Sequence, residues 1–151
     1  SMAERIFSDG KAVDIVEGLL FPYMMEDFRK FLETSENIVI FESATILEKP
    51  FFDDFGDKVM LVDAPFETRL DRACERDNAS RDAVMARMGA QELMNAFSDG
   101  SISAYPQDSR YGRVRARVDV IIMNDSSVSD LELAVKAAME RILADNLIMT
   151  N

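Results

Sequence analysis

Histidine is absent from the 151 residues of this chain. Its absence excludes the serine–histidine and cysteine–histidine pairs of nucleophilic enzymes, because both need an imidazole as the base. It also excludes every metal site that uses a histidine ligand. Any proton transfer that this protein carries out must therefore use carboxylates, and the chain has 28 of these as Asp and Glu.

Cysteine is nearly absent, and long apolar runs are missing. The single Cys74 cannot form a disulfide within the chain. No stretch approaches the roughly 20 apolar residues of a membrane-spanning helix, and no signal peptide is visible. We therefore expect a reducing, cytoplasmic location and no membrane partner.

Positive charge is scarce, with 17 Lys and Arg against 28 Asp and Glu and a net charge of −11. This balance argues against a broad nucleic-acid surface, so we expect no nucleic-acid partner, although a local basic pocket for a small anion is compatible with it. With 48% hydrophobic and 30% charged residues, the composition is that of a globular protein. It predicts one soluble domain over residues 1–151.

The chain does contain alternating strand and helix patterns. Continuous apolar runs, typical of strands buried on both faces of a parallel sheet, occur at 37–41, 58–64 and 118–125. Helical patterns lie around and between them, at 11–32 with a break expected near Pro22, at 65–77 starting with Pro65, at 80–91 capped by Ser80, and at 128–147. This alternation predicts an α/β fold.

Two details of that alternation are specific enough to test. Turn residues followed by basic residues over 95–117 indicate a mobile loop that ends in a cationic arm. Ser129 or Asp130 is the expected start of the closing helix.

Arginines gather in the stretch "RLDRACERDNASRDAVMARMGAQ", residues 69–91. On a helix, Arg69, Arg72 and Arg76 share one stripe beside an apolar stripe. Arginine's planar fork suits phosphate or carboxylate, so the stripe predicts an anion site. The alternative is a solvated face with ion pairs between neighbouring turns.

Polar residues follow each predicted strand directly. These are Glu42, Asp63 and Asn124. Ligands of open parallel sheets bind beyond the carboxyl ends of the strands, so we expect these three residues to lie near a ligand. A polar residue at the end of a strand can also simply mark where the chain leaves the core.

The arginine stretch resembles a known family. "VDAPFETRLDRACERDNASRDAVMARMGAQ" is similar to the dephospho-CoA kinase pattern E-T-x-L-x-R-x-x-x-R-D, followed by a Ser-Arg helix start and a glutamine. "ERIFSDGKAVDIVEGLLFPYMMEDF" and "VDVIIMND" resemble other segments of the same family, and together the pieces cover most of residues 4–135. Phe21 departs from the family, which has a histidine before the proline.

The resemblance implies the fold and the reaction. The fold would be a three-layer parallel sheet of the P-loop kinase type, and residues 77–117 would form a lid and mobile arm. The reaction would transfer the γ-phosphoryl group of ATP, with Mg²⁺, to the ribose 3′-hydroxyl of dephospho-CoA, the final step of CoA biosynthesis.

The resemblance also implies roles for particular residues. Arg72, Arg76 and Arg115 would neutralise charge on the transferring phosphate, and Asn124 would lie near the adenine. Glu42 to Glu48 and Phe21 would border the acceptor site. We rank Arg69 and Arg87 lower, as arginines that solvent could simply surround.

The family's phosphate loop, G-x-x-x-x-G-K-[ST], does not occur in this sequence. We therefore expect a P-loop kinase fold without its first strands, with most of the Mg²⁺ site missing and no turnover by this chain alone. The apolar strands beside the gap should pair with each other or across a homodimer. An incomplete chain and a natural remnant both fit.

Two other functions stay open. The chain could belong to another nucleotide or small-molecule kinase, since Phe21 and the long 92–117 segment depart from the pattern where an acceptor would bind. It could also be a non-catalytic remnant that binds a phosphorylated ligand or associates with itself.

Overall fold

The computed structural model describes residues 10–44, 46–49 and 55–149. By its internal contacts the chain divides into two compact units, Ser1–Ser43 and Ala44–Asn151. The prediction of a single domain concerns how these units associate, and it stays a prediction. Residues 4–7, which carry the E-R-I-F part of the resemblance, lie outside the described residues.

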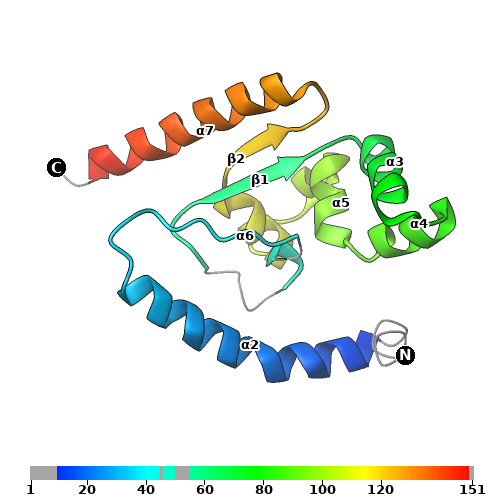
Figure 1. Ribbon diagram of the computed structural model, residues 1–151, viewed down its shortest axis with the longest axis horizontal. Helices are drawn as coiled ribbons and strands as arrows, with labels where there is room; N and C mark the ends of the chain where they lie inside the picture. Colours follow the sequence, from blue (N-terminus) through cyan, green and yellow to red (C-terminus); the bar gives the residue numbers. More distant parts are fainter. Residues whose placement is uncertain (1–9, 45, 50–54, 150–151) are drawn as a thin grey trace. The chain divides into compact units, whose positions relative to one another are not determined.

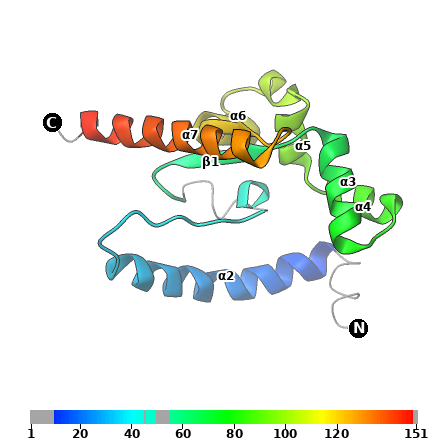
Figure 2. The same cartoon turned by 45° about the horizontal axis from the view of Figure 1, so that its top comes forward.

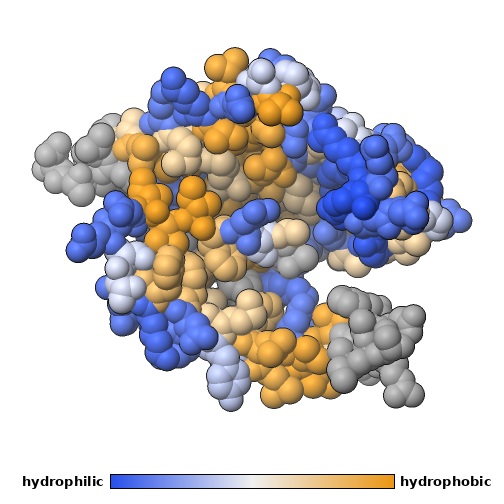
Figure 3. Space-filling view, viewed as in Figure 1, coloured by the Kyte–Doolittle hydropathy of each residue, from blue (hydrophilic) through white to orange (hydrophobic). Residues whose placement is uncertain are grey.

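The first unit is built around one long helix, α2 (Gly10–Glu33), which runs through Pro22 without interruption. The predicted break near Pro22 is therefore wrong. A proline inside a helix removes one backbone donor, and it can kink the helix without ending it when the neighbouring turns keep their bonds. Apolar side chains lie at the surface of α2, where Leu19 and Phe31 are more than half exposed (Figure 3).

Residues 37–41 follow α2 and form no strand, so the strand predicted there is also wrong. Ile38 and Ile40 are 65% and 78% exposed, and they join no ladder of backbone hydrogen bonds. Phe41 instead packs edge-on against Phe28 of α2, with ring centroids 5.3 Å apart. An apolar run is a strand only where a neighbouring strand pairs with it, and this run has no such neighbour among the described residues.

The second unit holds a parallel sheet of two strands, β1 (Val59–Asp63) and β2 (Val118–Met123) (Figure 1). Both strands were predicted within two residues of these bounds. Asp119 sets their register, because its carboxylate accepts a hydrogen bond from the Val59 amide (2.8 Å) and one from the Lys58 ammonium (3.1 Å). In the described part of the chain the sheet has no third strand, so β1 does not pair with residues 37–41.

Two predicted helices follow β1. Helix α3 (Phe66–Asp77) starts directly after Pro65, and α4 (Arg81–Gly89) starts after Ser80. The predicted cap is confirmed, since the Ser80 hydroxyl accepts a hydrogen bond from the Ala83 amide. The two helices pack together over the apolar side chains of Leu70, Val84 and Met88, all of which are buried.

The predicted loop at 95–117 is mostly helical. It contains the end of α5 (Glu92–Ser98), the short 3₁₀ helix η3 (Ser101–Ala104) and α6 (Arg110–Arg117). The loop prediction is wrong because it misses the Ser109 hydroxyl, which caps α6 by accepting a bond from the Gly112 amide. Gly112 also lets α6 pack closely, since a Cβ atom there would lie 2.1 Å from the Pro106 carbonyl oxygen.

The closing helix, α7 (Val128–Met149), lies along β2 (Figure 2). Ser127 caps it rather than Ser129 or Asp130: its hydroxyl accepts a bond from the Asp130 amide, and the Asp130 carboxylate accepts one from the Ser127 amide. This exchange is a capping box, which satisfies two donors that a helix start otherwise leaves open. Figure 2 shows α6 behind the sheet and α7 in front of it.

Candidate functional site

The carboxyl ends of β1 and β2 meet, as the sequence predicts for two of its three polar strand ends. The Asn124 amide donates a hydrogen bond of 2.6 Å to the Asp63 carbonyl oxygen. The third predicted strand end, Glu42, follows no strand and belongs to the other unit. The candidate site therefore consists of Asp63, Asn124 and the helices that reach them.

Arg72 reaches this edge from the second turn of α3. One of its terminal nitrogens, Nη1, donates a hydrogen bond of 2.7 Å to the Asn124 carbonyl oxygen. A guanidinium has five N–H donors, and this bond uses one of them. Arg72 is otherwise exposed, so the fold holds an arginine at the strand ends where an anionic ligand could meet it. Two residues that the sequence singled out, Arg72 and Asn124, are brought into contact.

Asp63, which the sequence marks only as the end of a strand, carries a buried carboxylate at this edge. Asp63 is 5% exposed. Its Oδ1 atom accepts hydrogen bonds from the Ala64 amide (2.8 Å) and the Ser98 hydroxyl (2.9 Å). A buried carboxylate without partners is very costly, so these contacts are what allow Asp63 to lie in the interior.

Arg69 supplies the positive charge for Asp63. Its Nε atom lies 3.8 Å from Oδ1 of Asp63, and its Nη2 donates a long hydrogen bond of 3.4 Å to the Asn95 side-chain oxygen. The side chain is only 17% exposed, so the expectation that solvent could surround it is wrong. Helical spacing places Arg69 on the arginine stripe but does not reveal how deep each residue of that stripe lies.

Comparison with known proteins gives the family. A family model described as dephospho-CoA kinase matches residues 1–96. The chain belongs to the dephospho-CoA kinase family. Proteins named dephospho-CoA kinase resemble it at 29% identity in Idiomarina loihiensis, over 95% of this chain and 63% of the relative. The figures are 35% in Bacteroides fragilis, over 60% and 44%, and 33% in Porphyromonas gingivalis, over 70% and 54%. The chain thus spans between 44% and 63% of the lengths of these relatives.

Arg76, which the resemblance to dephospho-CoA kinases also implies, lies in a different environment from Arg72. Its side chain is 75% exposed, and its guanidinium binds the carboxylate of Asp77 through Nε at 2.7 Å and Nη2 at 3.2 Å. Arg87 of α4 binds the same carboxylate at 2.7 Å. Hydrogen bonds from Arg76 and then Arg87 hold the pKa of Asp77 well below its ordinary value. A catalytic role for Arg76 stays a prediction.

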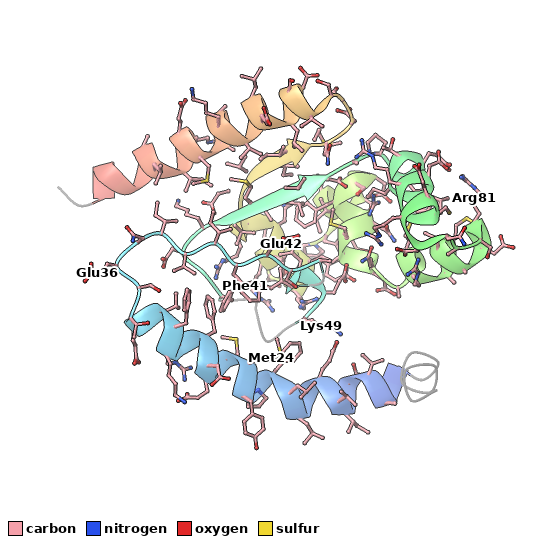
Figure 4. All side chains as sticks on the ribbon, in the orientation of Figure 1. Met24, Glu36, Phe41, Glu42, Lys49 and Arg81 are labelled. Atoms are coloured by element: carbon pink, nitrogen blue, oxygen red, sulfur yellow. The ribbon has the colours of Figure 1, made fainter. Side chains whose placement is uncertain are left out.

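The other end of α4 carries a second ion-pair group. Arg81 binds Glu67 and Asp71 of α3. Figure 4 labels Arg81 at the α3–α4 end of the second unit, away from the two strands. The arginines of residues 69–91 therefore lie in two kinds of environment. Arg69 and Arg72 lie at the strand ends, and Arg76, Arg81 and Arg87 form exposed ion pairs.

The predicted lid arginine, Arg115, is part of α6. Its Nη1 donates a hydrogen bond of 3.3 Å to the Ser103 carbonyl oxygen. The three other arginines of α6 also bind backbone carbonyl groups: Arg110 that of Leu47, Arg113 that of Asp108, and Arg117 those of Phe55 and Gly56. The predicted cationic arm is thus a helix whose arginines hydrogen-bond to backbone carbonyl groups. The lid role of Arg115 stays a prediction.

The predicted acceptor residues divide between the two units. Glu48 belongs to the second unit, and its carboxylate caps α5 by accepting hydrogen bonds from the Leu93 and Met94 amides (3.2 and 2.9 Å). That contact gives Glu48 a structural role. Phe21 lies on α2, and Glu42 lies beyond its end, so both belong to the first unit. Acceptor binding by these three residues stays a prediction.

The described residues contain no group of three Cys, Asp or Glu side chains that could hold a metal ion. None of the helices in the described ranges has the length and apolar character needed to cross a membrane. At the strand ends, arginine donors and backbone groups lie around the buried carboxylate of Asp63.

Proposed function

We propose that this chain is part of a dephospho-CoA kinase, which transfers the γ-phosphoryl group of ATP to the ribose 3′-hydroxyl of dephospho-CoA. The observation that carries the proposal is the position of Arg72 in a member of this family: it lies at the carboxyl ends of parallel strands, in contact with Asn124. Ligands of open α/β sheets bind at that edge.

In the proposed reaction, the acceptor oxygen forms a bond to the γ-phosphorus while the bond from that phosphorus to the β,γ-bridging oxygen breaks. ADP leaves, and the hydroxyl proton passes to a general base, for which this chain offers carboxylates and no histidine. Negative charge spreads over the oxygens of the phosphoryl group in flight. Arg72 would donate to those oxygens, with Arg76 and Arg115 as the further cations, and Asn124 would lie beside the adenine.

ATP is the proposed cosubstrate, and Mg²⁺ is its usual companion in phosphoryl transfer, where it neutralises charge on the β- and γ-phosphates when bound. The residues of this chain do not fully account for the binding of ATP or of Mg²⁺. The phosphate loop is not in the sequence, and the described residues offer no cluster of metal ligands. We therefore assign to no residue of this chain the binding of the metal, or of the β- and γ-phosphates of ATP before the transfer begins.

The finer points of the fold belong to the same proposal. We propose that β1 and β2 form part of a three-layer parallel sheet whose first strands this chain does not supply. The β1 edge that does not face β2 would then pair with such a strand or with a second copy of the chain. A cytoplasmic location with dephospho-CoA as the substrate completes the proposal.

Fusion to a segment that carries the family's phosphate loop tests the function. Such a segment, taken from the Idiomarina loihiensis relative, would be joined to residues 1–151, and the fusion would be assayed with ATP and dephospho-CoA. The fusion should form CoA, whereas the 151-residue chain alone should form none, because arginines cannot by themselves position the phosphates. A folded fusion that phosphorylates adenylate but not dephospho-CoA would point to another kinase.

A matched control fixes the interpretation. The same fusion carrying Arg72→Ala should fold and lose most of its turnover. If neither fusion phosphorylates any acceptor while both bind ATP, the proposed function fails and the non-catalytic alternative stands.

A further inference from the structure

Asp63 is the one buried charged residue in the described part of the chain. It joins three elements at a single point. Its backbone carbonyl accepts the Asn124 amide at the end of β2, and its carboxylate accepts the Ala64 amide at the entry to α3 and the Ser98 hydroxyl of α5. Any shift of α3 against the strands must therefore disturb the surroundings of this carboxylate.

Arg69 and Arg72 lie one helical turn apart on α3 and reach the two strand ends side by side. Arg69 lies against the carboxylate of the residue that ends β1, and Arg72 binds the carbonyl of the residue that follows β2. Asp63 and Asn124 are themselves bonded to each other. The four residues form a closed frame of two helical side chains and two strand ends.

We infer that Arg69 is a positioning residue: its pairing with buried Asp63 fixes the register of α3 against the strand ends and so holds Arg72 at Asn124. Lysine could replace the charge of Arg69, but it lacks the fork that reaches Asp63 and Asn95 together. The family pattern leaves position 69 open, so the motif by itself assigns no role to Arg69. The purpose of placing Arg72 rests on the proposed function; its placement does not.

The geometry explains why this pair matters more than an exposed one. The Arg69 Nε atom is buried and, within the described residues, has no hydrogen-bond acceptor, so the Asp63 carboxylate is its nearest compensation. A buried charge pair commits both partners to one arrangement, because either charge alone in the interior is strongly unfavourable. Because the Arg69–Asp63 pair keeps one arrangement, α3 keeps a fixed position against β1, and Arg72 keeps its position with it.

Arginine side-chain NMR of the ligand-free 151-residue chain tests the inference. Rotation of the Arg72 guanidinium about its Cζ–Nε bond is measured in the native chain, in Arg69→Met and in Arg69→Lys, with Arg113→Met in α6 as the control. Arg72 should rotate slowly in the native chain and in the control. In Arg69→Met it should rotate about tenfold faster, the factor expected when a charge-assisted hydrogen bond is lost.

Two further variants keep the test decisive. Arg69→Lys should give an intermediate rate, because the charge remains and the fork does not. The double variant Asp63→Asn, Arg69→Met removes both charges and so avoids an unpaired buried ion; it should fold while Arg72 rotates fast. Slow rotation of Arg72 in a folded Arg69→Met or double variant would overturn the inference and leave Arg69 a purely structural residue.

Failure here and failure of the proposed function are distinguishable, because this measurement uses no ATP and no acceptor. Slow, Arg69-dependent rotation of Arg72 combined with an inert fusion protein would uphold the positioning role and reject the kinase. Fast rotation in the native chain combined with an active fusion would do the reverse.

Discussion

The two ends of α3 carry the same kind of ion pair in opposite environments. At the start of the helix, Arg69 and Asp63 have side chains that are 17% and 5% exposed; at its end, the values for Arg76 and Asp77 are 75% and 24%. The outer pair has the better geometry, with 2.7 Å between Nε and the nearest carboxylate oxygen against 3.8 Å for the inner pair. Geometry alone would therefore rank the outer pair as the more important.

Burial reverses that ranking. Exposed ion pairs are worth little, because water screens them and two long side chains must be ordered to form them. Breaking a buried pair leaves one charge stranded in the interior, which is strongly destabilising whatever the net worth of the intact pair. Figure 3 shows the outer end, where hydrophilic residues predominate at the surface of α3 and α4. The arginines of this acidic chain thus form ion pairs of two kinds, and we expect the inner pair to contribute more to the stability of the fold.

The largest expected effect comes from removing the inner carboxylate. Asp63→Ala strands the buried Arg69 charge and leaves the Ala64 amide and the Ser98 hydroxyl without their acceptor. It should lower the free energy of unfolding by about 3 kcal/mol, measured by urea denaturation. Asp77→Ala at the outer end should shift the urea midpoint far less.

Asp63→Asn serves as the gentler control, because it keeps an acceptor oxygen while removing the charge. It should fall between the native chain and Asp63→Ala. Equal midpoint shifts for Asp63→Ala and Asp77→Ala would show that burial does not separate the two ends.

The next comparison concerns activity in the fusion protein described above. Arg72→Ala should lower kcat by about 10²-fold with a smaller change in the KM for ATP, because its contact is proposed to strengthen in the transition state. Arg76→Ala should have a smaller effect, since Arg76 must first leave the Asp77 carboxylate to reach a phosphate. A larger loss for Arg76→Ala would mean that the outer pair opens during turnover.

Local signals in the sequence were enough to find α3, α4 and both strands. Their limits follow from what each signal measures. Residues 37–41 and 59–63 are both continuous apolar runs, yet only the second is a strand, because β2 pairs with it and the Lys58–Asp119 contact fixes the register. Strand pairing is a long-range property that an apolar run does not encode.

The same limit applies to the candidate site. The sequence predicted Arg72 and Asn124 as site residues, because one lies on the helix that follows a predicted strand and the other lies at the end of a predicted strand. It misjudged Arg69, because a helical stripe gives direction around the helix and not depth in the fold. Helix α6 was missed because turn residues precede it and Gly112 lies within it. The close approach of Gly112 to the Pro106 carbonyl, which favours a glycine there, is a contact that residue composition does not reveal.

A smaller effect on stability is expected from a substitution at Ser80, between α3 and α4. Ser80 caps α4, whose Arg81 and Arg87 supply cations to the outer ion pairs. Ser80→Ala should cost about 1 kcal/mol of unfolding free energy, the usual worth of such a cap. Hydrogen exchange at the Ala83 amide should accelerate, whereas exchange within β1 should keep pace with the global change alone. Selective acceleration in β1 would mean that the two ends of α3 are coupled.

The smallest expected effect is a pH dependence confined to the outer pair. Asp77 has a pKa lowered from its ordinary value of 3.8 by hydrogen bonds from Arg76 and then Arg87. A carboxyl group whose pKa is lower in the folded state binds fewer protons there than in the unfolded chain, so its contribution is present above pH 3.8 and disappears as the pH falls below it. The urea midpoint of the native chain should therefore fall slightly more steeply below pH 4 than that of Asp77→Asn, and the two curves should run parallel above about pH 5.

Because the pair is exposed, added salt should reduce the difference. A difference that is unchanged by salt, or one that appears only above pH 5, would contradict the assignment of Asp77 to a solvent-screened pair.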